Sequence, residues 1–152
     1  MEDNNYFERI ARAPAHCNVM PSMKFTPYKE VLGICFGTLE ATIIEIHGKP
    51  ERVGENRLGS KELIFPDKIF RLRPSDGALH EVTLDSECFQ LEGREIGFAE
   101  LGFFVAKHDL NSFEASGFVV SPKYGIAFDW HHKYFLTIFC EADLKEWEKL
   151  KA

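Results

Sequence analysis

The sequence predicts an α+β domain built from two helix-plus-sheet units in tandem. A helix pattern is followed by three short strand patterns, the same order of elements recurs in the second half, and 152 residues are enough for one domain. Hydrophobic residues make up 45% and charged residues 28%, as in globular proteins. We expect three-stranded antiparallel meanders whose sheets join or abut, with the helices on one face and a helix at the C-terminus.

The chain divides into four segments of a single domain, 1–152. Prolines interrupt residues 1–27, and we expect an N-terminal arm there that packs on the body or frays. The first helix-and-meander unit spans 28–87 and the second spans 88–140. Residues 141–152 begin with acidic residues and end with lysines, an order that suits the dipole of a C-terminal helix.

The first unit opens with a helix pattern. Thr38 is a suitable N-cap residue, because its hydroxyl can accept a hydrogen bond from an early backbone N–H. Leu39, Ile43 and Ile46 follow at a spacing of three to four residues and share one apolar face. Gly48 can adopt the left-handed conformation that ends a helix, and the proline two residues later prevents its continuation.

Three strand patterns follow this helix, at 62–65, 69–73 and 79–84. The middle pattern alternates apolar and basic residues, which is typical of a half-buried strand. Ser75-Asp76-Gly77 is a hairpin turn signal between the second and third strands. We therefore expect an antiparallel meander.

The second unit repeats this plan. A helix pattern at 97–109 lies 60 residues after the first, and strand patterns at 118–120, 126–128 and 134–139 lie 56 residues after their counterparts. The difference predicts a loop that is four residues shorter in the second unit. The repeated order indicates an internal duplication, with chance similarity as the alternative because few letters match.

Phenylalanine is unusually frequent, with 14 residues. Neither unit is large enough to bury sufficient apolar surface alone, so we expect a shared core filled by these rings. Those on predicted elements are Phe70, Phe103, Phe104, Phe118, Phe128, Phe135 and Phe139.

The formal net charge of −6 excludes some partners and favours others. The chain has no cluster of lysines and arginines, so we expect no nucleic-acid binding. No apolar run is long enough to cross a bilayer, so we expect no membrane partner. An acidic surface suits a basic protein partner. The alternative is that the charge merely keeps the protein soluble.

The cysteines and the first residues predict a cytoplasmic location. Cys35, Cys88 and Cys140 lie among apolar neighbours and no Cys-x-x-Cys pair occurs, so we expect reduced, unreactive thiols in the core. The first residues have neither the basic nor the apolar region of a secretory signal.

No sequence motif predicts catalysis. Asp129, His131 and His132 form the strongest candidate metal site, but adjacent strand residues point to opposite faces, so an exposed turn is the expected structure unless the turn bends them together. Glu40 and Glu100 occupy matched positions, where solvated first-turn helix residues are a better explanation than a glycosidase pair. We expect no catalytic residue, no metal and no cofactor.

Aromatic residues beside predicted turns are candidate contacts for a partner protein. Tyrosine and tryptophan are enriched in interface hot spots, and acidic and histidine side chains lie next to these rings. The alternative is that the rings close the ends of the core. The candidate residues are Asp67, Asp76, Tyr124, Asp129, Trp130, His131, His132 and Tyr134.

The stretch 37–50 reads Gly37-Thr38-Leu39-Glu40, Ile43-Ile44 and His47-Gly48-Lys49-Pro50. It resembles the G-small-x-E…G-x-P stretch of the BamE-type outer-membrane assembly lipoproteins. The tandem order over about residues 25–140 resembles the β-lactamase inhibitor proteins, BLIP. The resemblance implies a helix-plus-sheet fold, a sheet used as a binding face, and no catalytic residue. The chain shows no lipoprotein signal, which argues against an outer-membrane role.

Together these observations predict a non-enzymatic cytoplasmic immunity protein of bacterial type. It would bind a cognate antibacterial toxin and neutralise it by occluding the toxin's active site. A basic protein toxin, such as a nuclease, would be a natural partner. The alternatives are a small-molecule-binding module or uncharacterised enzyme with a pocket between the two units, and a scaffold within a homo-oligomer.

Overall fold

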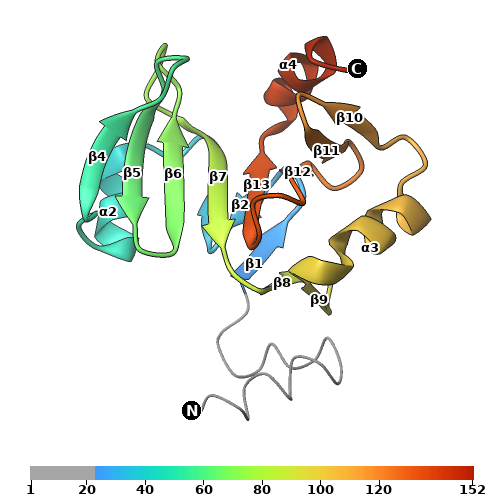
Figure 1. Ribbon diagram of the computed structural model, residues 1–152. Helices are drawn as coiled ribbons and strands as arrows, with labels where there is room; N and C mark the ends of the chain where they lie inside the picture. Colours follow the sequence, from blue (N-terminus) through green and yellow to red (C-terminus); the bar gives the residue numbers. More distant parts are fainter. Residues whose placement is uncertain (1–22) are drawn as a thin grey trace.

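The computed structural model describes residues 23–152 and shows a mixed α+β protein that is rich in strands (Figure 1). One sheet has five strands in the order β3-β2-β1-β8-β9, and the other has eight in the order β10-β11-β12-β13-β7-β6-β5-β4. All neighbours pair antiparallel except β1 and β8, which are parallel. These features confirm the predicted α+β class with antiparallel sheets.

The strands and helices have the following bounds. The first unit contains β1 (Met23–Thr26), β2 (Glu30–Val31), β3 (Ile34–Cys35), α2 (Glu40–His47), β4 (Arg52–Glu55), β5 (Lys61–Phe65), β6 (Lys68–Leu72) and β7 (Leu79–Asp85). The second contains β8 (Cys88–Leu91), β9 (Arg94–Gly97), the 3₁₀ turn η2 (Phe98–Glu100), α3 (Leu101–His108), β10 (Phe113–Ala115), β11 (Phe118–Ser121), β12 (Ile126–Phe128) and β13 (Phe135–Phe139). The 3₁₀ turn η3 (Glu141–Asp143) and α4 (Leu144–Lys149) end the chain.

The large sheet consists of two meanders joined edge to edge. β7 pairs with β13 through Val82–Ile138, Thr83–Thr137 and Leu84–Leu136. The two units therefore join into one sheet, but each meander has four strands instead of the predicted three. The additional strands, β4 and β10, are short edge strands. β4 has one large apolar residue, Val53, and no alternation, and the alternation of β10 covers only three residues, so neither stands out in the sequence.

The order of elements repeats as the sequence indicates. A shift of 56 carries β5, β6 and β7 onto residues that include β11, β12 and β13, and a shift of 60 carries α2 to within one residue of α3. Each helix is also preceded by strands of the small sheet, in which β1 and β8 lie side by side. The repeat therefore extends to elements that the sequence patterns did not include.

The main core lies between one face of the large sheet and the layer formed by α2, α3 and the small sheet. Ile43 of α2 and Leu101 and Val105 of α3 belong to the same buried cluster as the aligned sheet residues Leu63, Phe70, Val82, Ile126 and Ile138. A smaller cluster on the opposite face contains Ala127 and Phe139 and packs against Leu144 and Trp147 at the C-terminal helix. The expectation of helices on one face thus holds for α2 and α3, whereas α4 covers the other face.

Of the seven phenylalanines on predicted elements, five contribute to the core. Phe70, Phe128 and Phe139 are fully buried, and Phe104 and Phe118 are partly buried. Phe103 is 83% exposed and Phe135 is 43% exposed, so the expectation is wrong for these two. Helix α3 turns Leu101 and Val105 toward the core, which places Phe103, two residues from each, on its outer side.

The start of helix α2 differs from the sequence prediction, whereas its C-terminal end agrees with it. The Thr38 hydroxyl donates to the Cys35 carbonyl at 2.7 Å, and the N-cap residue Leu39 provides no side-chain hydrogen bond. Only Ile43 of the predicted apolar face is buried. Gly48 has a φ of +89°, which its lack of a Cβ permits.

The predicted arm, 1–27, lies mainly outside the described residues, but its last part does not form an arm. Residues Met23–Thr26 form β1, which lies between β2 and β8 in the small sheet. Within residues 23–152, none of the helices has the length and apolar character required to cross a membrane.

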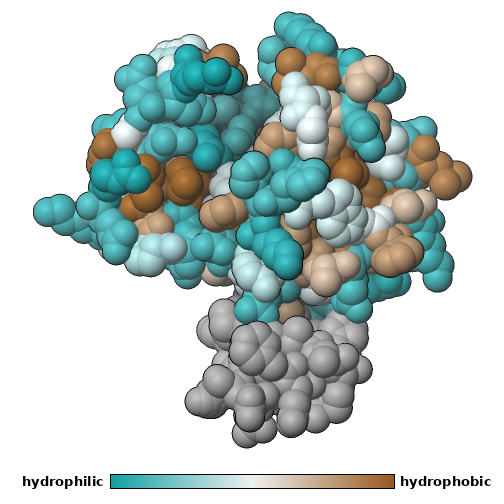
Figure 2. Space-filling model, in the orientation of Figure 1, coloured by the Kyte–Doolittle hydropathy of each residue, from teal (hydrophilic) through white to brown (hydrophobic). Residues whose placement is uncertain are grey.

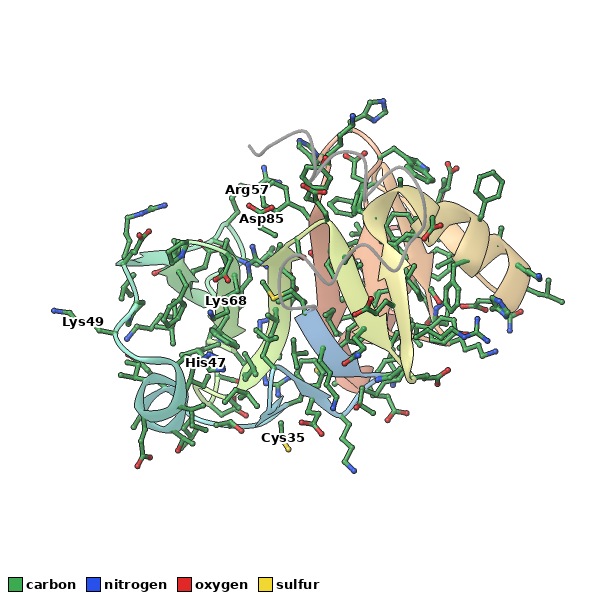
Figure 3. All side chains as sticks on the ribbon, turned by 90° about the horizontal axis from the view of Figure 1, so that it is seen from below. Cys35, His47, Lys49, Arg57, Lys68 and Asp85 are labelled. Carbon is green, nitrogen blue, oxygen red and sulfur yellow. The ribbon has the colours of Figure 1, made fainter. Side chains whose placement is uncertain are left out.

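The cysteines do not share one redox state. Cys35 is a free, exposed thiol at the margin of the molecule (Figure 3), and Cys140 is a free, buried thiol whose pKa is raised by burial. Cys88 is disulfide-bonded. The expectation of reduced thiols is therefore wrong at Cys88, and the exposure of Cys35 shows that it is not a core residue.

Candidate functional site

Six of the eight predicted contact residues lie at one end of the large sheet. Five of them share the turn between β12 and β13: Asp129, Trp130, His131, His132 and Tyr134. Asp67 lies in the neighbouring β5–β6 turn. The backbone joins these turns through the end of β7, where the N–H of Asp85 donates to the Asp67 carbonyl and the N–H of Ser86 donates to the Tyr134 carbonyl.

The carboxylate of Asp129 organises the β12–β13 turn. It accepts a hydrogen bond from the backbone N–H of His131 at 2.9 Å and lies 3.2 Å and 3.0 Å from Nδ1 of His131 and His132. The His131 amide is the main cause that lowers the Asp129 pKa, and both imidazoles add to it. The turn therefore bends both rings toward one carboxylate, although both remain largely exposed.

Trp130 both closes the core and reaches solvent. Its indole lies directly over Gly102 of α3, where a Cβ would stand only 2.1 Å from the ring. It also packs edge-on against Phe98 and Phe128. An apolar hollow of about 470 Å³ lies beside it, between α3 and the β10–β11 hairpin. The ring therefore closes one end of the core and keeps part of its surface exposed to solvent.

The other two predicted contact residues lie elsewhere. Tyr124 is only 3% exposed and packs on Phe104 with ring centroids 5.3 Å apart, so it offers no surface to a partner. Asp76 lies in the β6–β7 turn at the opposite end of the strands, where it pairs with Arg73 and accepts a hydrogen bond from the Ala78 N–H. The eight predicted residues therefore do not form one site.

A groove on the second face of the large sheet is the strongest site candidate that sequence reasoning missed. It runs between the β4–β5 hairpin and α4 and has a volume of about 690 Å³. Figure 2 shows it as the recess between two lobes, one containing the β4–β5 hairpin and the other containing α4. Residues from both units line it: Glu55, Asn56, Arg57, Leu58, Glu62, Arg71, His80, Glu81, Phe118, Thr137, Asp143, Glu146, Trp147 and Leu150.

A β-bulge places two consecutive side chains in this groove. Arg71 pairs with Glu81 across β6 and β7, but the next register position pairs Leu72 with Leu79. His80 is thus the additional residue on β7. Consecutive residues of a regular strand point to opposite faces, and the bulge removes this restriction, so His80 and Glu81 both line the groove.

Arg71 lies at the centre of the groove floor. Its Nε donates to Oε2 of Glu62 at 2.8 Å, and its Nη1 donates to Oε2 of Glu81 at 2.9 Å and to Oγ1 of Thr83. The Thr83 hydroxyl in turn lies 2.9 Å from that of Thr137, across the β7–β13 junction. Burial raises the pKa of Glu81, and the guanidinium of Arg71 acts in the opposite direction.

His80 connects the first unit to the C-terminal segment. Its Nδ1 lies 2.6 Å from Oδ2 of Asp143, and its Nε2 lies 2.9 Å from Oγ of Ser60 in the β4–β5 hairpin. The order Ser60–His80–Asp143 is that of a serine-hydrolase triad. Ser60 is only 3% exposed, however, so its hydroxyl is closed to a substrate and the contact holds the hairpin in place.

The same residues offer ligands to a metal ion. His80, Glu81 and Asp143 each provide one ligand atom within 4.8 Å of the others, and histidine with carboxylates is a set that zinc accepts. Both imidazole nitrogens of His80 and Oε2 of Glu81 already have protein partners, so a metal would have to replace these contacts. As it stands, the site is an ion-paired hydrogen-bond network.

The groove carries a large share of the acidity of the protein. Its lining includes five carboxylates (Glu55, Glu62, Glu81, Asp143 and Glu146) and two arginines (Arg57 and Arg71), a formal charge of −3 with His80 neutral. The whole chain carries −6. A concave surface lined by one sign of charge concentrates the field and attracts a partner of opposite charge.

Comparisons with models of protein families, with curated proteins and with solved structures find no match to this chain.

Proposed function

We propose that this protein is an immunity or inhibitor protein that binds a basic protein toxin through the groove. The observation that carries the proposal is the open, acidic face of the large sheet, with a formal charge of −3. A basic segment of the toxin would enter the groove, and the two lobes would then block the toxin's active site. The BamE-like and BLIP-like resemblance supports the use of the sheet as a binding face.

Two further features agree with this proposal. The β12–β13 turn presents Trp130 and Tyr134, which are partly exposed and of the type enriched in interface hot spots. The negative groove would repel phosphate groups, which fits a protein partner better than a nucleic acid. The mechanism is occlusion and needs no catalytic residue and no cofactor.

Capture of the partner tests the proposal. The tagged protein, purified from the strain that makes it, should retain a basic protein in stoichiometric amount, and 0.5–1 M salt should release it because the attraction is electrostatic. The variant Glu55→Gln/Glu146→Gln should slow association by on the order of threefold, since rim charges act mainly on the association rate.

The matched control carries the same charge change away from the groove. Glu45→Gln/Glu51→Gln alters two exposed carboxylates near α2 and should associate as fast as wild type. The proposal fails if no basic protein is retained, or if both double variants slow association equally, since a general loss of charge would then explain the result.

A second candidate function is supported by the size of the groove. A volume of about 690 Å³, lined by both units, lies within the range of small-molecule sites. A protein of this class would retain a ligand through purification. Native mass spectrometry would then show a mass above that of the chain, and the bare mass would count against this candidate.

The cytoplasm is our proposed location, and Cys88 provides its test. Cytoplasmic thiols are kept reduced, so rapid alkylation in intact cells should label Cys88 if the protein resides there. The disulfide at Cys88 is an observation against this location. If Cys88 resists labelling until a reductant is added, an oxidising compartment replaces the cytoplasm in the proposal.

A further inference from the structure

The two sides of the groove differ in chemistry. On one side, Phe118 and Trp147 form an aromatic wall, with ring centroids 5.3 Å apart in an edge-to-face arrangement. On the floor, β5 and β7 present the carboxylates of Glu62 and Glu81. An aromatic face attracts a cation, and carboxylates accept its hydrogen bonds. The pair of surfaces therefore matches a planar, delocalised cation.

The floor has more carboxylates than cations. Arg71 bonds Oε2 of Glu62 and Oε2 of Glu81, and within residues 23–152 no donor reaches Oε1 of either residue. The side chains of Glu62 and Glu81 are only 17% and 20% exposed. A poorly solvated charge without full compensation is unfavourable, so a second cation at Oε1 would stabilise the floor.

We propose that the groove binds one arginine side chain of the partner protein, with its guanidinium held between the Trp147 ring, which packs on Phe139, and the carboxylate of Glu81, which pairs with Phe139 across β7 and β13. The inference rests on the proposed function and specifies the chemistry of the partner. Arginine fits better than lysine because its planar guanidinium both stacks on aromatic rings and donates several hydrogen bonds in a fixed fork.

A titration with small probes tests the site without the partner. Arginine amide is added to the ¹⁵N-labelled full chain and compared with citrulline amide, in which a neutral urea group of similar shape replaces the guanidinium. We expect saturable shifts of the Trp147 indole and of amides in β5 and β7 with arginine amide, and at least tenfold weaker binding of citrulline amide. Lysine amide should bind with intermediate strength.

Two variants identify the groups responsible. Trp147→Leu keeps apolar packing on Phe139 but removes the ring face, and should weaken binding of arginine amide about three- to tenfold. Glu81→Gln keeps the shape of the side chain and should weaken it about tenfold. Glu45→Gln on α2 is the control for loss of one charge and should bind as wild type does. Each amide spectrum also reports whether the variant is folded.

The outcomes separate this inference from the proposed function. Equal binding of arginine and citrulline amides, or unchanged binding by folded Trp147→Leu and Glu81→Gln, overturns the arginine site even if a basic partner is captured. A captured partner whose affinity these variants leave unchanged also overturns it. Failure to capture any partner contradicts the proposed function, whereas the probe titration is read independently of that result.

Discussion

Replacing Arg71 with methionine should destabilise the protein by about 2–4 kcal/mol. The change removes the cation that contacts both Glu62 and Glu81 and leaves these carboxylates poorly solvated. Breaking a buried pair by removal of one partner costs roughly 3–5 kcal/mol, and side-chain exposures of 15–20% reduce this figure somewhat. The free energy of unfolding, from urea titrations at pH 7, measures the loss.

The loss of stability in Arg71→Met should also depend on pH. Burial raises the pKa of Glu81, and Arg71 opposes that effect, so Arg71→Met should raise this pKa further. A carboxyl group whose folded-state pKa exceeds its unfolded value weakens the fold while it is ionised, above the folded-state pKa. The penalty is relieved as the pH falls toward the unfolded value, about 4.3 for glutamate. The deficit of the variant should therefore shrink between pH 7 and about pH 4.

Two controls make the reasoning refutable. Arg57→Met removes the exposed arginine of the groove and should stay within about 0.5 kcal/mol of wild type. The triple variant Arg71→Met/Glu62→Gln/Glu81→Gln removes both charges that need compensation and should recover part of the loss. An Arg71→Met protein as stable as wild type, or a deficit that grows on acidification, would refute the electrostatic explanation.

Three further predictions concern other parts of the fold. Asp109→Asn should cost about 1–3 kcal/mol, because this buried carboxylate accepts three hydrogen bonds. Burial alone would raise the pKa of Asp109, but these hydrogen bonds lower it, so its stabilisation should be lost as a urea-unfolding series is taken to acid pH. Gly102→Ala should displace Trp130, shift the tryptophan emission and cost about 1–3 kcal/mol. Tyr28, partly buried and bonded to the Pro122 carbonyl, has a pKa raised to about 12, so its absorbance should change at a higher pH than that of a free tyrosine.

The sequence predicts the order of elements well because strands β5–β7 and β11–β13 each have an apolar pattern of their own. Alternation in 69–73 correctly places Phe70 in the core and Arg71 on the opposite face. The edge strand β4 has no such pattern, since an exposed strand with a single neighbour needs no apolar alternation. In β10 the alternation covers only three residues, which is too short to indicate a strand. Both β4 and β10 become strands through pairing with β5 and β11.

The groove was not predictable for a different reason. His80 and Glu81 are adjacent in sequence, so a regular strand would place them on opposite faces, but a bulge brings both to one face. Asp143 is distant in sequence and comes from the C-terminal segment, so no spacing indicates that the three lie together. The signal that was present is the polar character of Glu62, Arg71 and Glu81, which share one face of the predicted meander. Tyr124 is a predicted contact residue that the structure buries. Its position beside a turn suggested an exposed ring, but the ring packs on Phe104 of α3.

The junction of β7 and β13 has a consequence for how the chain reaches its native state. It joins residues that are far apart in the chain, such as Thr83 and Thr137, which are separated by 54 positions. Such non-local pairing slows folding. Until it forms, β7 and β13 each present an unpaired edge to other molecules, and a fragment containing only one half would keep that edge permanently. We expect the separated halves to aggregate, and the intact chain to show a slow, late folding phase that Thr137→Val leaves in place but Thr137→Pro abolishes together with the native sheet.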